Sequence, residues 1–127
     1  MCQNYVAVRP ETPIGRAVEQ LVEENASVLL VLDADLQLVG TVADSVLLRS
    51  AIDSQLRNDP ISLHVTRRFA AIPTRAPLDI VLDQFVLHDL PSIPVVDQKR
   101  VVGVICREDL LRAAFGLANA RVDAIGA

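Results

Sequence analysis

The sequence is poor in aromatic residues and contains no long apolar run. Aromatic residues make up 3% of the 127 positions, against a hydrophobic fraction of 51%, so Val, Leu, Ile and Ala must build the core. No stretch approaches the roughly 18 consecutive apolar residues of a membrane-spanning helix, and no signal peptide opens the chain. We therefore expect a cytoplasmic protein without a membrane partner.

Basic residues and cysteines are also scarce. The 12 Lys and Arg residues are outnumbered by 16 Asp and Glu, which gives a net charge of −4. A large basic surface is therefore excluded, and nucleic acid is not an expected partner. The two cysteines, Cys2 and Cys106, have neither the spacing of a metal site nor that of a redox motif, so we predict that both are reduced and that the chain holds no metal.

The residue clusters that catalysis requires are missing as well. No motif brings together a nucleophile, a general base and an oxyanion-binding group, so His64 is not a candidate for a catalytic triad. Neither Gly40 nor Gly103 has the second glycine of a phosphate-binding loop, so both are interpreted as packing or bulge glycines. We predict that the chain is not an enzyme and requires no cofactor.

The chain does contain one long pattern that occurs twice. Residues 92–112 are SIPVVDQKRVVGVICREDLLR, and residues 29–49 are LLVLDADLQLVGTVADSVLLR. Each has two β-branched runs around a short polar break and then a Leu-rich segment, which predicts a hairpin followed by a helix that starts, in the second pattern, at Asp109. The glycines lie 63 residues apart whereas earlier elements lie 64 apart, so the second hairpin turn is one residue shorter.

A strand and a helix precede each copy of this pattern. Thr12 and Pro13 are typical of an N-cap followed by a first-turn proline. The buried stripe that follows contains Ile14, Ala17, Val18, Leu21 and Val22. Pro77 opens the second helix, whose stripe is Leu78, Val81, Leu82, Phe85 and Val86. The other expected elements are strands at 5–8 and 69–72, a hairpin of 27–32 with 37–42, and a helix at 44–55 that offers Val46, Leu47, Ala51 and Ile52 for burial.

The order strand, helix, strand, strand, helix thus occurs twice, which indicates an internal duplication. One such unit is too small to bury its sheet face and helix stripes alone. We predict an α+β fold of two β-α-β-β-α repeats, packed sheet to sheet with pseudo-twofold symmetry. The predicted boundaries are 1–56 for the first repeat, 57–68 for a linker, 69–118 for the second repeat and 119–127 for a C-terminal tail.

The repeated pattern resembles a known family. The apolar-Pro-Val-Val-Asp strand at 93–97 and the Val-Gly-Val-Ile-x-x-x-Asp-Leu-Leu pattern at 102–111 resemble a CBS domain, named for cystathionine β-synthase. Two in tandem, over residues 5–115, resemble a CBS pair, and the segment 64–68 is similar to the Met-Thr segment that often precedes the second copy. The resemblance implies a regulatory module that binds AMP, ADP, ATP or S-adenosylmethionine between the repeats, dimerises, and controls a partner protein.

The resemblance also implies which residues bind the ligand. Asp109, six residues past Gly103, would accept hydrogen bonds from the ribose hydroxyls, and a carboxylate there suits the helix dipole. Cys106 stands where the family has Thr or Ser, and a thiol is the weaker hydrogen-bond partner. The other implied contacts are Ile93 and Pro94 beside the adenine, backbone groups of Ala71 and Ile72 at its edge, and Arg67, Arg68 and Arg107 at the phosphates.

The first copy departs from the family pattern at three positions. Ala43 replaces the Thr or Ser, Val46 replaces the Asp, and Leu30 replaces the Pro. We therefore expect at most one nucleotide site. An acidic residue such as Asp109 is also ordinary in a first helical turn for dipole reasons alone. The alternative function is accordingly a structural homodimerisation module whose ligand sites have been lost, and the ligand and the regulated protein stay open.

Overall fold

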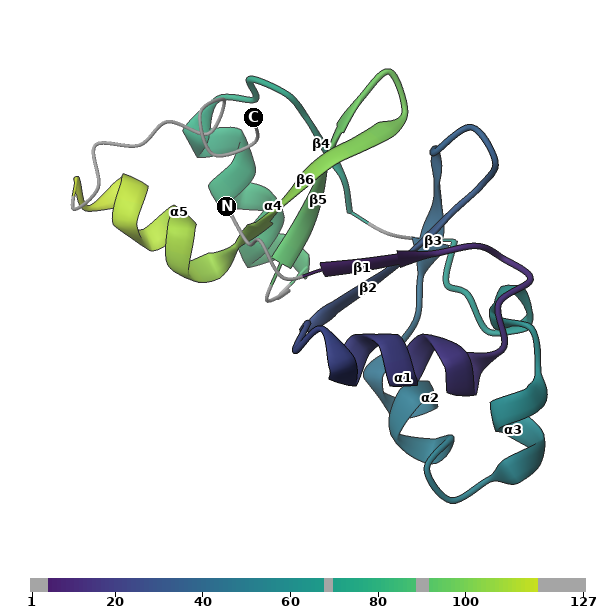
Figure 1. Cartoon of the computed structure of the whole chain (residues 1–127). Helices are drawn as coiled ribbons and strands as arrows, with labels where there is room; N and C mark the ends of the chain where they lie inside the picture. The colour runs from purple at the N-terminus through teal and green to yellow at the C-terminus, as the bar shows by residue number, and fades with distance from the viewer. Residues whose placement is uncertain (1–4, 68–69, 89–91, 117–127) are drawn as a thin grey trace. The chain divides into compact units, whose positions relative to one another are not determined.

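The computed structural model describes residues 5–67, 70–88 and 92–116 (Figure 1). The chain divides into two compact units, with the boundary between Phe69 and Ala70. Each unit contains one three-stranded sheet together with helices. The predicted α+β fold class is confirmed, and so is the predicted arrangement in two repeats.

The first unit is built around the sheet order β1-β2-β3. Its first two strands are parallel, because a helix connects them, and the next two form an antiparallel hairpin. The elements are β1 (Tyr5–Val8), α1 (Ile14–Glu23), β2 (Val28–Leu32), β3 (Leu38–Thr41), α2 (Asp44–Arg49), α3 (Ser54–Asn58) and the short 3-10 helix η1 (Ile61–Leu63).

The second unit repeats this topology with the sheet order β4-β5-β6. The first pair is again parallel and the second pair antiparallel. Its elements are β4 (Ile72–Pro73), α4 (Leu78–His88), β5 (Ser92–Asp97), β6 (Arg100–Cys106) and α5 (Arg107–Ala114). Helices α4 and α5 lie on the same face of this sheet (Figure 1), since side chains from both belong to one core with β5 and β6.

Each unit has its own aliphatic core. In the second unit the fully buried Val81 of α4 packs with Ile93 and Ile105 of the sheet. In the first unit Ile14 of α1 packs with Val31 of β2 in the same way. With so few aromatic side chains, branched aliphatic residues supply nearly all of the apolar area that leaves water on folding.

Each of the two hairpins has a β-bulge beside its glycine. Gly40 pairs with Val31 and Gly103 pairs with Val95, and in each case the register shifts at the next pair. This confirms the interpretation of both residues as packing or bulge glycines. The second turn is also the shorter one, since Gln98 and Lys99 alone connect the strands and both have positive φ, as a two-residue hairpin turn requires.

Helix α1 begins differently from the prediction. Pro13 is its N-cap residue, and no side chain caps the helix, so the expected cap by the Thr12 hydroxyl is wrong. The Thr12 carbonyl instead accepts a hydrogen bond from the Ile61 amide, 2.8 Å away. This backbone contact joins residues far apart in the sequence.

The predicted helix stripes are each one residue too long. Ile14, Ala17, Val81 and Phe85 are buried as expected, but Val22 is 72% exposed and its equivalent, Val86, is 81% exposed. Both lie near the end of their helix. The same apolar position is thus exposed to solvent in both repeats.

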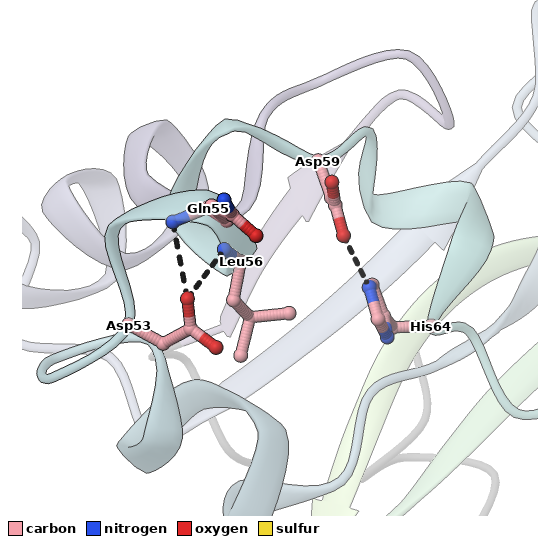
Figure 2. A network of polar contacts seen from close by, with 5 residues as sticks. All are labelled: Asp53, Gln55, Leu56, Asp59 and His64. Atoms are coloured by element: carbon pink, nitrogen blue, oxygen red, sulfur yellow. Dashed lines mark hydrogen bonds and ion pairs between the residues drawn. The ribbon is translucent and has the colours of Figure 1, made fainter.

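The predicted helix at 44–55 is two helices. Helix α2 ends at Arg49, and α3 starts after Asp53, whose carboxylate accepts from the Gln55 and Leu56 amides at 3.1 and 3.2 Å (Figure 2). This N-cap satisfies two amides that would otherwise lack partners. Ile52 lies in the break and is 87% exposed, so its expected burial is wrong, as is that of Ala51.

The remaining differences are at element ends. Strand β4 comprises Ile72 and Pro73 rather than 69–72, and α5 begins at Arg107, two residues before the predicted start. Ala70 and Ala71 are not in a strand, and Phe69 lies outside the described residues. The predicted C-terminal tail at 119–127 also lies outside them.

Candidate functional site

The predicted ligand residues of the second unit come from one end of its sheet. Strands β4 and β5 are parallel, so their first residues lie at the same end. Strand β6 runs antiparallel to β5, and its last residue, Cys106, pairs with Ser92, the first residue of β5. The start of α5 follows directly. The register therefore brings Ala71, Ile72, Ile93, Pro94, Cys106, Arg107 and Asp109 to one sheet end.

Asp109 is the third residue of α5, in the first helical turn. Its side chain is 17% exposed, and its Oδ1 atom lies 3.9 Å from Nη1 of Arg112, whose own side chain is 62% exposed. At this distance and exposure the ion pair is weak. A carboxylate in a first helical turn interacts favourably with the helix dipole, and its oxygens can accept hydrogen bonds from hydroxyl donors.

Cys106 differs from its prediction in one respect. It is the N-cap residue of α5, as the spacing from Gly103 implies, but its side chain makes no capping hydrogen bond. It is also disulfide-bonded, so the prediction of a reduced Cys106 is wrong. The other cysteine of the sequence, Cys2, lies outside the described residues. A disulfide sulfur carries no S–H group and so donates no hydrogen bond. This position therefore offers a ligand fewer hydrogen bonds than a Thr or Ser hydroxyl would.

The two apolar residues of β5 play different roles. Ile93 is fully buried in the core with Val81 and Phe85, so its side chain faces the helices. Pro94 is buried as well, and strand alternation places it on the opposite face of the sheet. Of the pair, Pro94 is thus the side chain on the sheet face away from the helices.

The start of β4 offers backbone groups rather than side chains. Ile72 is 2% exposed and belongs to the core, whereas Ala71 is half-buried and precedes the strand. Ile72 pairs with Val95 of β5. Ala71 therefore lies one residue nearer to the sheet end at which Pro94 also lies. Ala71 is therefore outside the ladder between β4 and β5.

The three arginines that were predicted at the phosphates are placed differently. Arg107 is the exposed first residue of α5, next to Cys106. Arg67 is exposed too, but it belongs to the first unit, at the end of the segment that follows η1. Arg68 lies outside the described residues. Arg107 is thus the cation that the second unit itself supplies at this sheet end.

The equivalent positions of the first unit have the same backbone but no polar side chain. Ala43 is the N-cap of α2 as Cys106 is of α5, and Val46 is the third residue of α2 as Asp109 is of α5. Leu30, which replaces Pro94, is fully buried. Val46 packs partly buried against the core of its unit. The first unit therefore offers no side-chain acceptor at the position where the second unit has a carboxylate.

One arrangement was not predicted from the sequence. Thr66 pairs with Thr41 at the edge of β3, where the chain also approaches Gly40 closely. The partners are 25 positions apart in the sequence, which periodicity does not reveal; the single signal is the likeness of segment 64–68 to the family's Met-Thr segment. Within the described ranges, no group of three or more His, Cys, Asp or Glu side chains is placed to hold a metal, and no helix there is long and apolar enough to span a membrane.

Residues 1–53 and 61–116 match the family model of the CBS domain. A curated relative is the uncharacterized protein MJ1225 of Methanocaldococcus jannaschii, which is 22% identical over 112 residues. The match covers 88% of this chain and 40% of the relative. This chain therefore spans about two fifths of the length of that protein.

Solved structures with the same fold include two that were determined with bound ligands. CBSX2 in complex with AMP is 26% identical, with a TM-score of 0.75 over 91% of this chain and 90% of that chain. The CBS domain pair of MJ0100, in complex with 5′-methylthioadenosine and S-adenosyl-L-methionine, is 23% identical, with a TM-score of 0.74 over 92% and 93%. Both likenesses extend over nearly the whole of this chain.

Proposed function

The chain belongs to the CBS-domain family, and we propose that it is a regulatory module whose second repeat binds an adenosine-containing small molecule. CBS-domain pairs are typically regulatory rather than catalytic. On this proposal the ligand lies in a cleft between the two repeats, packed sheet to sheet, and its occupancy is passed to a partner protein. The chain acts in the cytoplasm as a homodimer.

The observation that carries the proposal is the position of Asp109. Its carboxylate lies in the first turn of α5, mostly shielded from solvent, at the sheet end where Pro94 and Ala71 also lie. A carboxylate can accept from two ribose hydroxyls at once, and an adenine beside Pro94 would find backbone groups at Ala71. Without that acceptor, each buried hydroxyl would cost about 1–3 kcal/mol. The AMP complex of CBSX2 supports adenosine compounds as the class to test.

A second candidate function is a homodimerisation module that binds no ligand. It is favoured by the loss of polar side chains at Ala43 and Val46, and by the disulfide bond that occupies the Cys106 side chain. Exposed aliphatic residues on the helices and in the break between α2 and α3 would then supply the dimer interface. These include Val22, Leu48, Ile52, Val86 and Leu87.

Thermal unfolding against a panel of ligands separates these two functions. The panel consists of AMP, ADP, ATP, S-adenosylmethionine and 5′-methylthioadenosine, with inosine monophosphate as a control that changes the adenine edge. A ligand at a hundred times its dissociation constant adds about 2.7 kcal/mol, which raises the midpoint of a chain this size by roughly 3–6 °C. We expect such a rise with at least one adenosine compound and a smaller one with inosine monophosphate. Unchanged midpoints across the whole panel would contradict ligand binding and favour the dimerisation module.

A further inference from the structure

Cys106 lies on the face of the second sheet that points away from its helices. The preceding residue, Ile105, belongs to the core with side chains of α4 and α5, and side chains alternate between the two faces of a strand. Val104 and Cys106 therefore lie on the other face, where Val104 pairs with Pro94 of β5. The backbone of Cys106 is still extended, with φ −94° and ψ 155°. Its sulfur thus shares a sheet face with Pro94, which we propose beside the adenine.

The sulfur of Cys106 is held in a disulfide bond. The sequence contains two cysteines, Cys2 and Cys106. Within one chain, Cys2 is therefore the one residue that can supply the second sulfur, although it lies outside the described residues. The count of cysteines thus points to a bond that closes a loop from near the first residue to the end of β6.

The internal repeat supports the same pairing. With the offset of 64 between the earlier elements of the repeats, Cys2 corresponds to Thr66. In the first unit the Thr66 amide donates to the Thr41 carbonyl at 2.7 Å, and the Thr41 amide donates to the Thr66 carbonyl at 3.2 Å. Thr41 is two residues before Ala43, the equivalent of Cys106. The first unit therefore brings the two positions of the repeat that hold cysteine in the second copy close to each other.

We infer that Cys2 and Cys106 form a reversible disulfide that switches the ligand site of the second repeat, which binds an adenosine compound weakly when oxidised and more tightly when reduced. The inference rests on the proposed function, because it names a regulation of that same site. In the reduced chain the Cys106 S–H can donate one hydrogen bond on the ligand side of the sheet. In the oxidised chain the sulfur has no hydrogen to donate and carries Cys2 in its place.

The switch is a thiol–disulfide exchange with an external dithiol. One thiolate of the dithiol attacks a sulfur of the bond, the S–S bond breaks, and a mixed disulfide forms. The second thiolate of the dithiol then displaces the remaining cysteine. The chain gains two electrons and two protons as two thiols, and the dithiol becomes a disulfide. Cys106 is partly exposed, so a small dithiol can reach it.

Peptide mapping of the non-reduced chain tests the pairing without any ligand. Trypsin should release residues 1–16, since Arg9 precedes a proline, and residues 101–107. We expect these two peptides joined by one disulfide, and both as separate thiol peptides after dithiothreitol. A link between the Cys106 residues of two copies, or a free thiol at Cys106 in the non-reduced chain, would overturn the inference.

Titration calorimetry tests the switch with the panel compound that raises the unfolding midpoint most. We compare the non-reduced chain with the chain in dithiothreitol, and expect about fivefold tighter binding after reduction, the equivalent of one neutral hydrogen bond. Cys2→Ser keeps the Cys106 thiol and removes the partner sulfur, so it should bind like the reduced wild type with or without dithiothreitol. Cys106→Ser should be equally insensitive and bind at least as tightly, because a hydroxyl is the stronger hydrogen-bond partner.

The outcomes separate the switch from the proposed function. Equal affinities of the oxidised and reduced wild type would overturn the switch and leave the proposed function standing. A response to dithiothreitol that persists in Cys2→Ser would also overturn it, because that variant has no intrachain disulfide to reduce. A wild-type chain that binds no panel compound in either state contradicts the proposed function, and the switch is overturned with it.

Discussion

Val46 and Asp109 occupy the same backbone position in the two repeats, each as the third residue of the helix that follows the hairpin. One is an aliphatic side chain that packs against the core of its own unit, and the other is a carboxylate in a first helical turn. Because the backbone is equivalent, the chemistry of the two positions differs through the side chain alone. This asymmetry is why we propose one ligand site for the chain and not two.

The segment after α3 should contribute to stability as part of the first core. Ile61 is fully buried, whereas Leu63, two residues later in the same 3-10 helix, is 68% exposed. Replacing Ile61 with Ala should lower the free energy of unfolding by about 2–5 kcal/mol, since it removes buried methyl groups and leaves a cavity. The matched change Leu63→Ala should stay within about 0.5 kcal/mol of wild type. Urea unfolding measures both, and equal losses would show that Ile61 is not the buried anchor.

The exposed valines at the helix ends should take part in self-association. Val22 and Val86 are equivalent in the two repeats and are 72% and 81% exposed. On the proposed homodimer, Val22→Lys and Val86→Lys should convert the chain to a monomer, because each puts a charge into an apolar interface. Gln20→Lys adds the same charge at an exposed polar position of α1 and should leave the dimer intact. Light scattering after size-exclusion chromatography gives the masses.

A wild-type chain of monomer mass would contradict the homodimer outright. A dimer that survives both valine substitutions would move the interface away from these helix ends.

Cys106 should be protected from alkylation until a reductant is added. The residue is disulfide-bonded, and a disulfide sulfur is not a nucleophile, whereas a reduced thiol forms the reactive thiolate. Peptide mapping of the native, non-reduced chain should therefore show no iodoacetamide adduct at Cys106, and mapping after reduction should show one there. Labelling of Cys106 without reductant would mean that the thiol is free in solution, as the sequence alone suggests. Cytosolic thiols are generally kept reduced, so a disulfide at Cys106 in solution would count against the proposed cytoplasmic location, and a free thiol would support it.

The features that could be predicted from the sequence are those that depend on the local spacing of apolar residues and glycines. Strand 5–8, the antiparallel pairing of both hairpins and the shorter second turn all follow from apolar alternation and from the spacing of Gly40 and Gly103. The bulge beside each glycine was also within reach, because an isolated glycine in a strand is typical of one. The duplication strengthened each of these predictions, since the same signal appeared twice.

The predictions from sequence were wrong where the structure departs from the preference that a local pattern indicates. The Thr12 side chain is a good N-cap, yet its carbonyl bonds with Ile61 and Pro13 takes the cap position. Ile52 fits a helical stripe, but Asp53 starts a new helix and leaves it exposed. Nothing in the spacing of two cysteines indicates a disulfide at Cys106. In the candidate site, the equivalence of positions 46 and 109 could be predicted from the repeat. The burial of the Ile93 side chain in the core could not, because it depends on the residues that pack around it.

The most direct measurement is titration calorimetry of wild type, Asp109→Ala and Val46→Ala with AMP, or with the panel compound that raises the unfolding midpoint most. We expect one binding site per chain, an affinity about tenfold or more weaker in Asp109→Ala, and an unchanged affinity in Val46→Ala, because on our proposal only the carboxylate at position 109 accepts from the ribose. Two sites per chain, or wild-type affinity in Asp109→Ala, would contradict the assignment of a single site to the second repeat.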